Sequence, residues 1–151
     1  MTIRFSFDTN FLIYAVDGRA GSKKLIAEQL LDRARLKRTA FVTEQSVIEF
    51  LHIATRKAEV PLRDAAAFVY ELLEIFELLL APRDIILRTL ENLSNHRLSV
   101  WDARMLALCS SHSCTVLFSE DMQDGGVYDG VRVVNPFHGA NQATVDEILN
   151  S

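Results

Sequence analysis

Four acidic residues stand at places in the sequence that suit catalytic side chains. Asp8 directly follows an apolar segment, Asp121 comes shortly after another, and Glu49 and Asp102 lie near the starts of two segments with helical spacing. In open parallel sheets, ligands bind outside the carboxyl ends of the strands, because the loops there diverge and leave a crevice. If these segments form such a sheet, the four carboxylates meet at one edge of it.

A cluster of carboxylates has a limited range of chemistry. Two of them about 4 Å apart, at an effective dielectric near 20, repel by roughly 4 kcal/mol. Three or four together must therefore take up protons or bind cations. Ligand sets made only of oxygen suit hard divalent ions, whereas histidine or cysteine in these places would suggest zinc or a softer metal. The cluster predicts a site for Mg²⁺ or Mn²⁺.

Each carboxylate, taken alone, also has an ordinary structural explanation. Glu49 with Ser46, and Asp102 with Ser99, could close capping boxes at helix starts. Asp8 could form an Asx turn, and Asp121 could belong to the turn before Gly125-Gly126. The case for a metal site rests on the convergence of the four and on no single one.

The elements that must position these residues alternate along the chain. Five short segments have strand character, at residues 3–7, 40–43, 78–80, 115–118 and 131–134. Between them, apolar residues recur at helical spacing in residues 11–16, 23–35, 46–56, 61–76, 84–93 and 100–110. Strands separated by helices imply a mainly parallel sheet covered on both faces. We therefore expect an α/β fold with a central sheet of about five strands.

Length and composition favour a single domain over residues 1–151. With 49% hydrophobic residues, a chain of 151 can bury its own core without disulfides. Glycine and proline are scarce, and their clusters near residues 18–21 and 125–130 suit loops within one domain. Cys109 and Cys114 lack a second pair at zinc-site spacing, so we expect them to be small core residues in a reducing compartment.

Charge and hydropathy exclude other classes. The chain has 16 basic and 20 acidic residues, a net charge of −4, and no basic tail. Composition alone therefore argues against nucleic acid as a partner, because nucleic-acid binders usually show a basic patch or stripe. No apolar run approaches the roughly 20 residues of a membrane span, and the N-terminus lacks the apolar region of a signal peptide. We expect a soluble cytoplasmic protein without membrane contact.

Four short motifs carry the acidic residues in order along the chain: FDTNFL (7–12), TEQSVIEF (43–50), VWDAR (100–104) and LFSEDM (117–122). With the closing VVNPF (133–137), they resemble the PIN-domain family, and within it the VapC-like toxins of bacterial toxin–antitoxin pairs. The resemblance extends from Phe5 to Phe137, nearly the whole chain. None of the motifs is decisive alone, but four in the right order are together fairly specific.

The resemblance implies a metal-dependent endoribonuclease that hydrolyses RNA phosphodiester bonds. It implies that Asp8, Glu49, Asp102 and Asp121 form the family's acidic quartet, with Mg²⁺ or Mn²⁺ as the cofactor. Thr9, Asn10 and Ser119 would be supporting polar groups, and Asp124 is a second candidate for the fourth acidic place. With divalent ions bound, the acidic net charge is no obstacle, because substrate phosphates would meet the metals.

The resemblance also implies partners: an RNA substrate, a second copy of the chain in a homodimer, and a small antitoxin protein that occludes the cleft. In the apolar segment 62–80, Phe68 and Ile75 could contact the antitoxin or simply pack in the core. Four basic side chains could contact phosphates or be ordinary surface charges: Lys23, Lys24, Arg97 and Arg104.

Several alternatives remain at this stage. A phosphatase with a catalytic aspartate would be expected to have Asp-x-Asp after the first strand, and Asn10 occupies the second place. A non-catalytic module on the same fold, a structural α/β domain and a housekeeping nuclease are the others. Trp101 could stack on a base, but a tryptophan beside a helix start is expected to pack.

Overall fold

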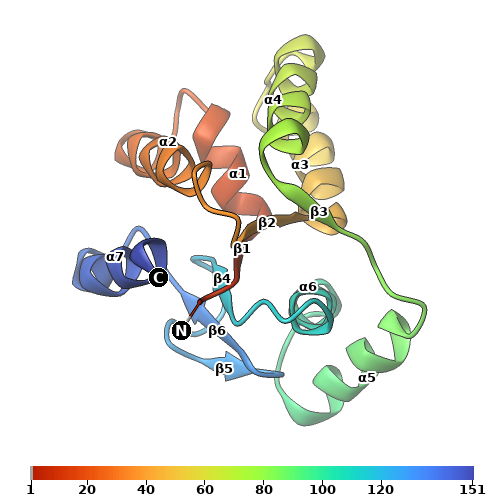
Figure 1. Cartoon of the computed structure of the whole chain (residues 1–151). Coiled ribbons are helices and arrows are strands. Elements are labelled where there is room, and N and C mark those ends of the chain that lie inside the picture. The colour runs from red at the N-terminus through yellow and green to blue at the C-terminus, as the bar shows by residue number, and fades with distance from the viewer. Residues whose placement is uncertain (1) are drawn as a thin grey trace.

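Six strands form one sheet in the computed structural model, which describes residues 2–151 (Figure 1). The order across the sheet is β3-β2-β1-β4-β6-β5, and every neighbouring pair is parallel except β5 with β6. The strands are β1 (Phe5–Phe7), β2 (Ala40–Thr43), β3 (Glu77–Leu79), β4 (Val116–Phe118), β5 (Val127–Tyr128) and β6 (Val131–Val134). The predicted mainly parallel α/β fold is confirmed. The sixth strand is β5, a two-residue hairpin partner of β6.

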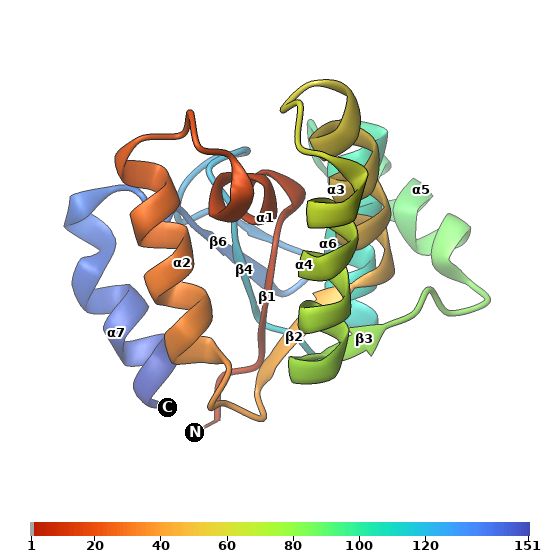
Figure 2. The ribbon, with the colours of Figure 1, turned by 90° about the horizontal axis from the view of Figure 1, so that it is seen from above.

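Helices cover both faces of the sheet, as predicted. They are α1 (Thr9–Val16), α2 (Ser22–Ala34), α3 (Glu44–Arg56), α4 (Leu62–Ile75), α5 (Ile85–Asn95), α6 (Val100–Ser111) and α7 (Gln142–Asn150). Helices α1 to α4 and α7 lie on one face, while α6 lies on the other with α5 outside it (Figures 1 and 2). Within residues 2–151, no helix has the length and apolar character needed to cross a membrane.

The larger core lies between β1 and the five-helix face, and aromatic rings fill it. The Phe7 ring stacks on Phe11 at a centroid distance of 4.9 Å and on Phe118 at 6.0 Å. Ser6 points to the opposite face, is fully buried, and donates its hydroxyl hydrogen to the Phe41 carbonyl at 2.8 Å. Successive side chains of β1 therefore point into the two cores on opposite faces of the sheet, and none points to solvent.

Replacing Phe7 by alanine is expected to lower the free energy of unfolding by about 3–5 kcal/mol, because the cavity forms at the centre of this aromatic cluster. Urea denaturation measures the change. Phe7→Leu is the matched control and is expected to cost clearly less, since most of the apolar volume stays. A Phe7→Ala protein within about 1 kcal/mol of the wild type would show that this core is not central to stability.

The smaller core lies under α6 and holds both cysteines. Cys109 and Cys114 are buried and free, and they pack with Leu117 and Phe41. Burial raises the pKa of each thiol above its ordinary value. They are small core residues, as predicted.

The parallel strands bring their carboxyl ends to one edge of the sheet. Phe7, Phe118 and Val134 are aligned in register across β1, β4 and β6. The Asp8 N–H donates to the Phe118 carbonyl at 2.9 Å, and the Ser119 N–H donates to the Val134 carbonyl at 3.0 Å. The two residues that follow the central strands are therefore fixed at the same level, where the predicted site was expected.

Candidate active site

Asp8 is the most buried acidic residue of the edge, with 6% of its surface exposed. One carboxylate oxygen accepts the Thr9 N–H at 2.7 Å and caps α1, and the other accepts the Ser119 hydroxyl at 2.6 Å. Burial raises the pKa of Asp8 to about 6, and the charges of Asp121 and Asp102 add to this, although the two hydrogen bonds oppose it. Asp8 is thus both a helix cap and a fixed carboxylate among like charges.

Glu49 lies one turn into α3 and turns toward the end of β1. One of its oxygens accepts the Thr9 hydroxyl at 3.2 Å, and the other accepts the Gln45 side-chain amide at 2.7 Å. The alternative that Glu49 closes a capping box with Ser46 is wrong. Thr43 is the cap, and its hydroxyl oxygen accepts the Ser46 N–H at 3.0 Å, because β2 passes directly into α3 there.

Asp102 lies in the first turn of α6, which Ser99 caps by accepting the Asp102 N–H at 3.1 Å. Ser99 is the cap that the capping-box alternative assumed. The cap uses only the backbone N–H of Asp102, and the Asp102 carboxylate takes no part in it. The charge of Asp102 raises the pKa of both Asp8 and Asp121. Its side chain therefore lies within electrostatic reach of both.

Asp121 follows β4 and closes the cluster. Its N–H donates to the Ser119 hydroxyl oxygen at 3.0 Å, and its carboxylate accepts the Asn10 side-chain amide at 2.9 Å. Burial raises the pKa of Asp121, and the charges of Asp102 and Glu120 contribute. Ser119 therefore contacts two carboxylate-bearing residues through one hydroxyl group, since it also donates to Asp8.

Asp124, the second candidate for the fourth place, has a different environment. Its carboxylate accepts the Asn135 N–H at 2.9 Å and the Asn141 side-chain amide at 2.8 Å. These bonds hold the segment that follows β6 and lower the pKa of Asp124. The geometry therefore groups Asp121 with Asp8, and Asp124 with the C-terminal loop.

Residues 6–123 match the PIN domain family, and this span contains the whole carboxylate cluster but not Asp124. The chain belongs to the PIN-domain family. The predicted family is thereby confirmed, on a match that covers more than half of the chain.

Solved structures with a similar fold include a toxin and a toxin–antitoxin complex. A toxin–antitoxin complex from Klebsiella pneumoniae is similar at 25% identity and a TM-score of 0.63, covering 88% of this chain and 98% of that one. VapBC2 from Rickettsia felis, bound to a promoter DNA fragment, has 11% identity, a TM-score of 0.65 and the same coverage. VapC20 from Mycobacterium tuberculosis, a toxin that cleaves the sarcin–ricin loop, has 18% identity and a TM-score of 0.59, covering 78% and 89%. No curated protein matches the sequence.

Arg104 joins the two helices that carry Glu49 and Asp102 in this PIN domain. Its guanidinium donates to the Gln45 side-chain oxygen at 2.8 Å and to the Glu44 carboxylate at 2.6 Å. The Gln45 amide in turn donates to Glu49. Arg104 is therefore engaged within the protein, a role that neither sequence alternative, phosphate contact or ordinary surface charge, included. The pattern held no signal for this link, because it spans two helices.

Lys23 is also engaged within the protein. It donates to Glu120 at 2.6 Å, and Glu120 accepts the Tyr14 hydroxyl as well. This network holds the loop next to Asp121 against α1 and α2. Lys24 pairs with Glu28 in the same way. Arg97 is the candidate phosphate ligand that forms no ion pair within the described residues 2–151.

Two surface hollows include residues from the start of α6 in their linings. One, of about 510 Å³, is polar and is lined by Arg97, Ser99 and Asp102 among others. The second, of about 650 Å³, lies between α3 and α6 and includes Glu49 and Trp101 in its lining. Asp102 lines the first hollow and Glu49 lines the second, so each hollow borders the acidic cluster at one carboxylate.

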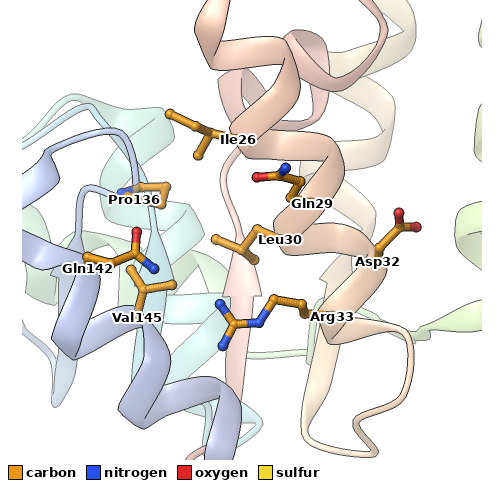
Figure 3. Close-up of a pocket in the computed structure, with 8 residues that line it drawn as sticks. All are labelled: Ile26, Gln29, Leu30, Asp32, Arg33, Pro136, Gln142 and Val145. Atoms are coloured by element: carbon orange, nitrogen blue, oxygen red, sulfur yellow. The ribbon is translucent and has the colours of Figure 1, made fainter.

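A third hollow, of about 330 Å³, lies between α2 and α7 (Figure 3). Leu30 from α2 and Val145 from α7 line it, with Arg33 and Gln142 nearby. None of the four acidic residues of the cluster lines it. It is separate from the candidate active site.

The cluster suits a divalent cation in charge and in donor type. Asp8, Glu49, Asp102 and Asp121 offer only oxygen ligands, and none of them has a salt bridge among residues 2–151. In the same part of the chain, no three His, Cys, Asp or Glu side chains are placed so that they could hold one metal ion. To bind one ion together, the carboxylates must therefore move closer to one another. Their mutual repulsion opposes this movement until a cation is present.

Proposed function

We propose that this PIN-domain protein is a metal-dependent endoribonuclease and the toxin of a toxin–antitoxin pair. One observation carries the proposal: the segment that matches the family, residues 6–123, places four acidic side chains at one edge of the sheet. The similarity to solved toxin structures supports the same assignment.

In this proposal Asp8, Asp102 and Asp121 hold Mg²⁺ or Mn²⁺, and Glu49 holds the ion or orients the attacking water as general base. When bound, a divalent ion acts as a Lewis acid toward the phosphodiester group. The chain itself supplies the position of each carboxylate. Thr9 and Gln45 hold both oxygens of Glu49, so a proton taken from water would be accepted at a fixed place.

The buried position of Asp8 supports its role as the anchor of the site. Its two oxygens are held by the Thr9 N–H and the Ser119 hydroxyl. Burial raises its pKa, and no salt bridge within residues 2–151 supplies a compensating positive charge. A cation bound beside Asp8 would supply that positive charge and stabilise the ionised carboxylate at the end of β1. Asn10 and Ser119 play the same supporting part for Asp121.

The proposed partners are an RNA substrate, a small antitoxin and a second copy of the chain. Two of the solved structures with this fold are complexes of toxin with antitoxin. On α4, Phe68 and Ile75 are partly buried against the core and also line a small surface hollow, so both core packing and an antitoxin contact stay open for them. Leu62, Tyr70 and Leu73 are the large apolar side chains that α4 exposes.

The experiment that tests the function is cleavage of a mixed RNA pool by purified, antitoxin-free protein. We expect cutting with Mg²⁺ or Mn²⁺ and none with EDTA. Size-exclusion chromatography with light scattering on the same sample tests the homodimer. If pure protein cuts no RNA at any metal concentration, yet binds RNA, the non-catalytic alternative replaces the proposal.

Arg104→Lys is expected to reduce the rate of cleavage about tenfold without unfolding the domain. A lysine cannot make the two-pronged contact to Gln45 and Glu44, so Gln45 and with it Glu49 would lose their fixed positions. The measurement is kcat and KM, with melting temperature as the check on folding. Arg38→Lys, on the exposed segment before β2, is the matched control. Equal rates for the two variants would show that Arg104 positions nothing that the reaction needs.

A further inference from the structure

The hollow between α3 and α6 is lined mainly by apolar surface and lies open to solvent. Trp101 is 64% exposed and Ile48 is 61% exposed, and both line it together with Ile53. The sequence suggested that Trp101 packs beside the helix start, but its indole ring lies largely in solvent. A tryptophan left so exposed on a structured helix has a large apolar face available to a ligand.

This hollow borders the candidate active site at Glu49. Glu49 forms part of its wall, and Trp101 directly precedes Asp102. The Trp101 carbonyl accepts the Gln45 side-chain amide at 3.0 Å, and the same amide donates to Glu49 at 2.7 Å. The backbone of Trp101 is therefore tied to a proposed catalytic carboxylate, while its ring is free to stack.

The lining favours one kind of occupant. An aromatic face stacks on any nucleobase, and the exposed Lys57 and His52 in the same lining offer groups that can meet phosphate or base edges. A base in a duplex is stacked and paired, so only an unpaired base could enter. The volume, about 650 Å³, falls in the range of small-molecule sites.

We propose that the hollow between α3 and α6 is a nucleobase subsite, in which Trp101 stacks on an unpaired base next to the phosphodiester that is cut. The inference rests on the proposed ribonuclease function and adds to it a residue that would contact a base of the substrate, Trp101. The polar hollow that Asp102 and Arg97 line leaves room for the RNA backbone to continue.

Trp101 is the only tryptophan of the chain, so its fluorescence reports on this hollow alone. The first test titrates Asp8→Asn protein, which should not cut, with a single-stranded oligoribonucleotide and with an abasic ribose-phosphate chain of equal length. We expect saturable quenching by the oligonucleotide and little by the abasic chain. Equal quenching by both, or no quenching by bound oligonucleotide, would overturn the proposal.

The second test measures cleavage by the wild type, Trp101→Phe and Trp101→Ala. Because Trp101→Ala removes the aromatic face on which the base would stack, it should raise KM about tenfold or more, with a smaller change in kcat. Trp101→Phe should recover most of the loss, because the aromatic face remains. Leu36→Ala, at an exposed leucine of the loop before β2, is the matched control.

Failure of the subsite and failure of the function give different results. If Trp101→Ala cleaves RNA with the wild-type KM, the subsite is refuted and the ribonuclease function stands. Absence of any cleavage by the wild type would refute the ribonuclease, while the fluorescence titration would still show whether Trp101 meets a base. If the hollow binds an apolar peptide and no oligonucleotide, a protein partner occupies it and the subsite is refuted.

Discussion

Asp8→Asn is expected to lower the rate of RNA cleavage at least about a hundredfold, because a bound divalent ion contributes several kcal/mol to catalysis and Asp8 is its proposed anchor. The asparagine is nearly the same size, and its side-chain oxygen can still accept the Thr9 N–H that caps α1. The domain should therefore stay folded. The measurement is kcat/KM at saturating Mn²⁺, with circular dichroism to confirm the fold.

Asp124→Asn is the matched control for this variant. It changes the same chemical group only a few residues from the cluster, at a carboxylate that holds Asn135 and Asn141. We expect its cleavage rate to stay within about twofold of the wild type. If Asp124→Asn abolished cleavage and Asp8→Asn did not, the proposed assignment of the acidic cluster would be wrong.

The second large effect concerns stability in the absence of metal. Asp8→Asn is expected to be more stable than the wild type at neutral pH, by an amount on the order of 3 kcal/mol, the equivalent of a pKa near 6 in the folded protein against 3.8. Burial is the main cause, since an ionised carboxylate at 6% exposure loses most of its hydration. The asparagine carries no charge and escapes this cost.

The direction with pH follows from the raised pKa. Because the folded state holds the Asp8 proton more tightly than the unfolded chain, its contribution to stability is full below about pH 3.8 and is lost as pH rises through about 6. The gap between the two proteins should be small near pH 4 and widest above pH 7. Urea denaturation in EDTA at several pH values measures it. A gap that is constant across this range would show that Asp8 does not titrate as described.

The regular part of the site could be predicted from the sequence. Asp8 and Asp121 follow apolar strands, and parallel strands must end at one edge, so their meeting follows from the alternation of strands and helices. Glu49 and Asp102 could be placed near helix starts by the same pattern. Helix α7 and strand β5 were not predicted, because α7 buries only three apolar residues and β5 has only two residues.

Features that depend on contacts between distant elements could not be predicted. The different environments of Asp121 and Asp124 depend on Asn10 on α1, which donates to Asp121, and on Asn135 after β6, which donates to Asp124. The bonds of Arg104 depend on how α3 and α6 lie side by side. The exposure of Trp101 has the same origin, since spacing along a helix does not say whether a neighbouring helix covers a side chain.

The most direct test of the proposed metal site is a calorimetric titration of the RNA-free protein with Mn²⁺, comparing the wild type, Asp102→Asn and Asp124→Asn. The charge of Asp102 acts on Asp8 and Asp121, and its carboxylate makes no salt bridge within residues 2–151. That carboxylate should therefore matter for cation binding more than for folding. We predict that the wild type and Asp124→Asn bind Mn²⁺ alike and that Asp102→Asn binds it at least about tenfold more weakly, a loss of roughly 1.4 kcal/mol or more. Equal binding by all three proteins, or none by the wild type at millimolar Mn²⁺, would contradict the assignment of this edge of the sheet as a metal site.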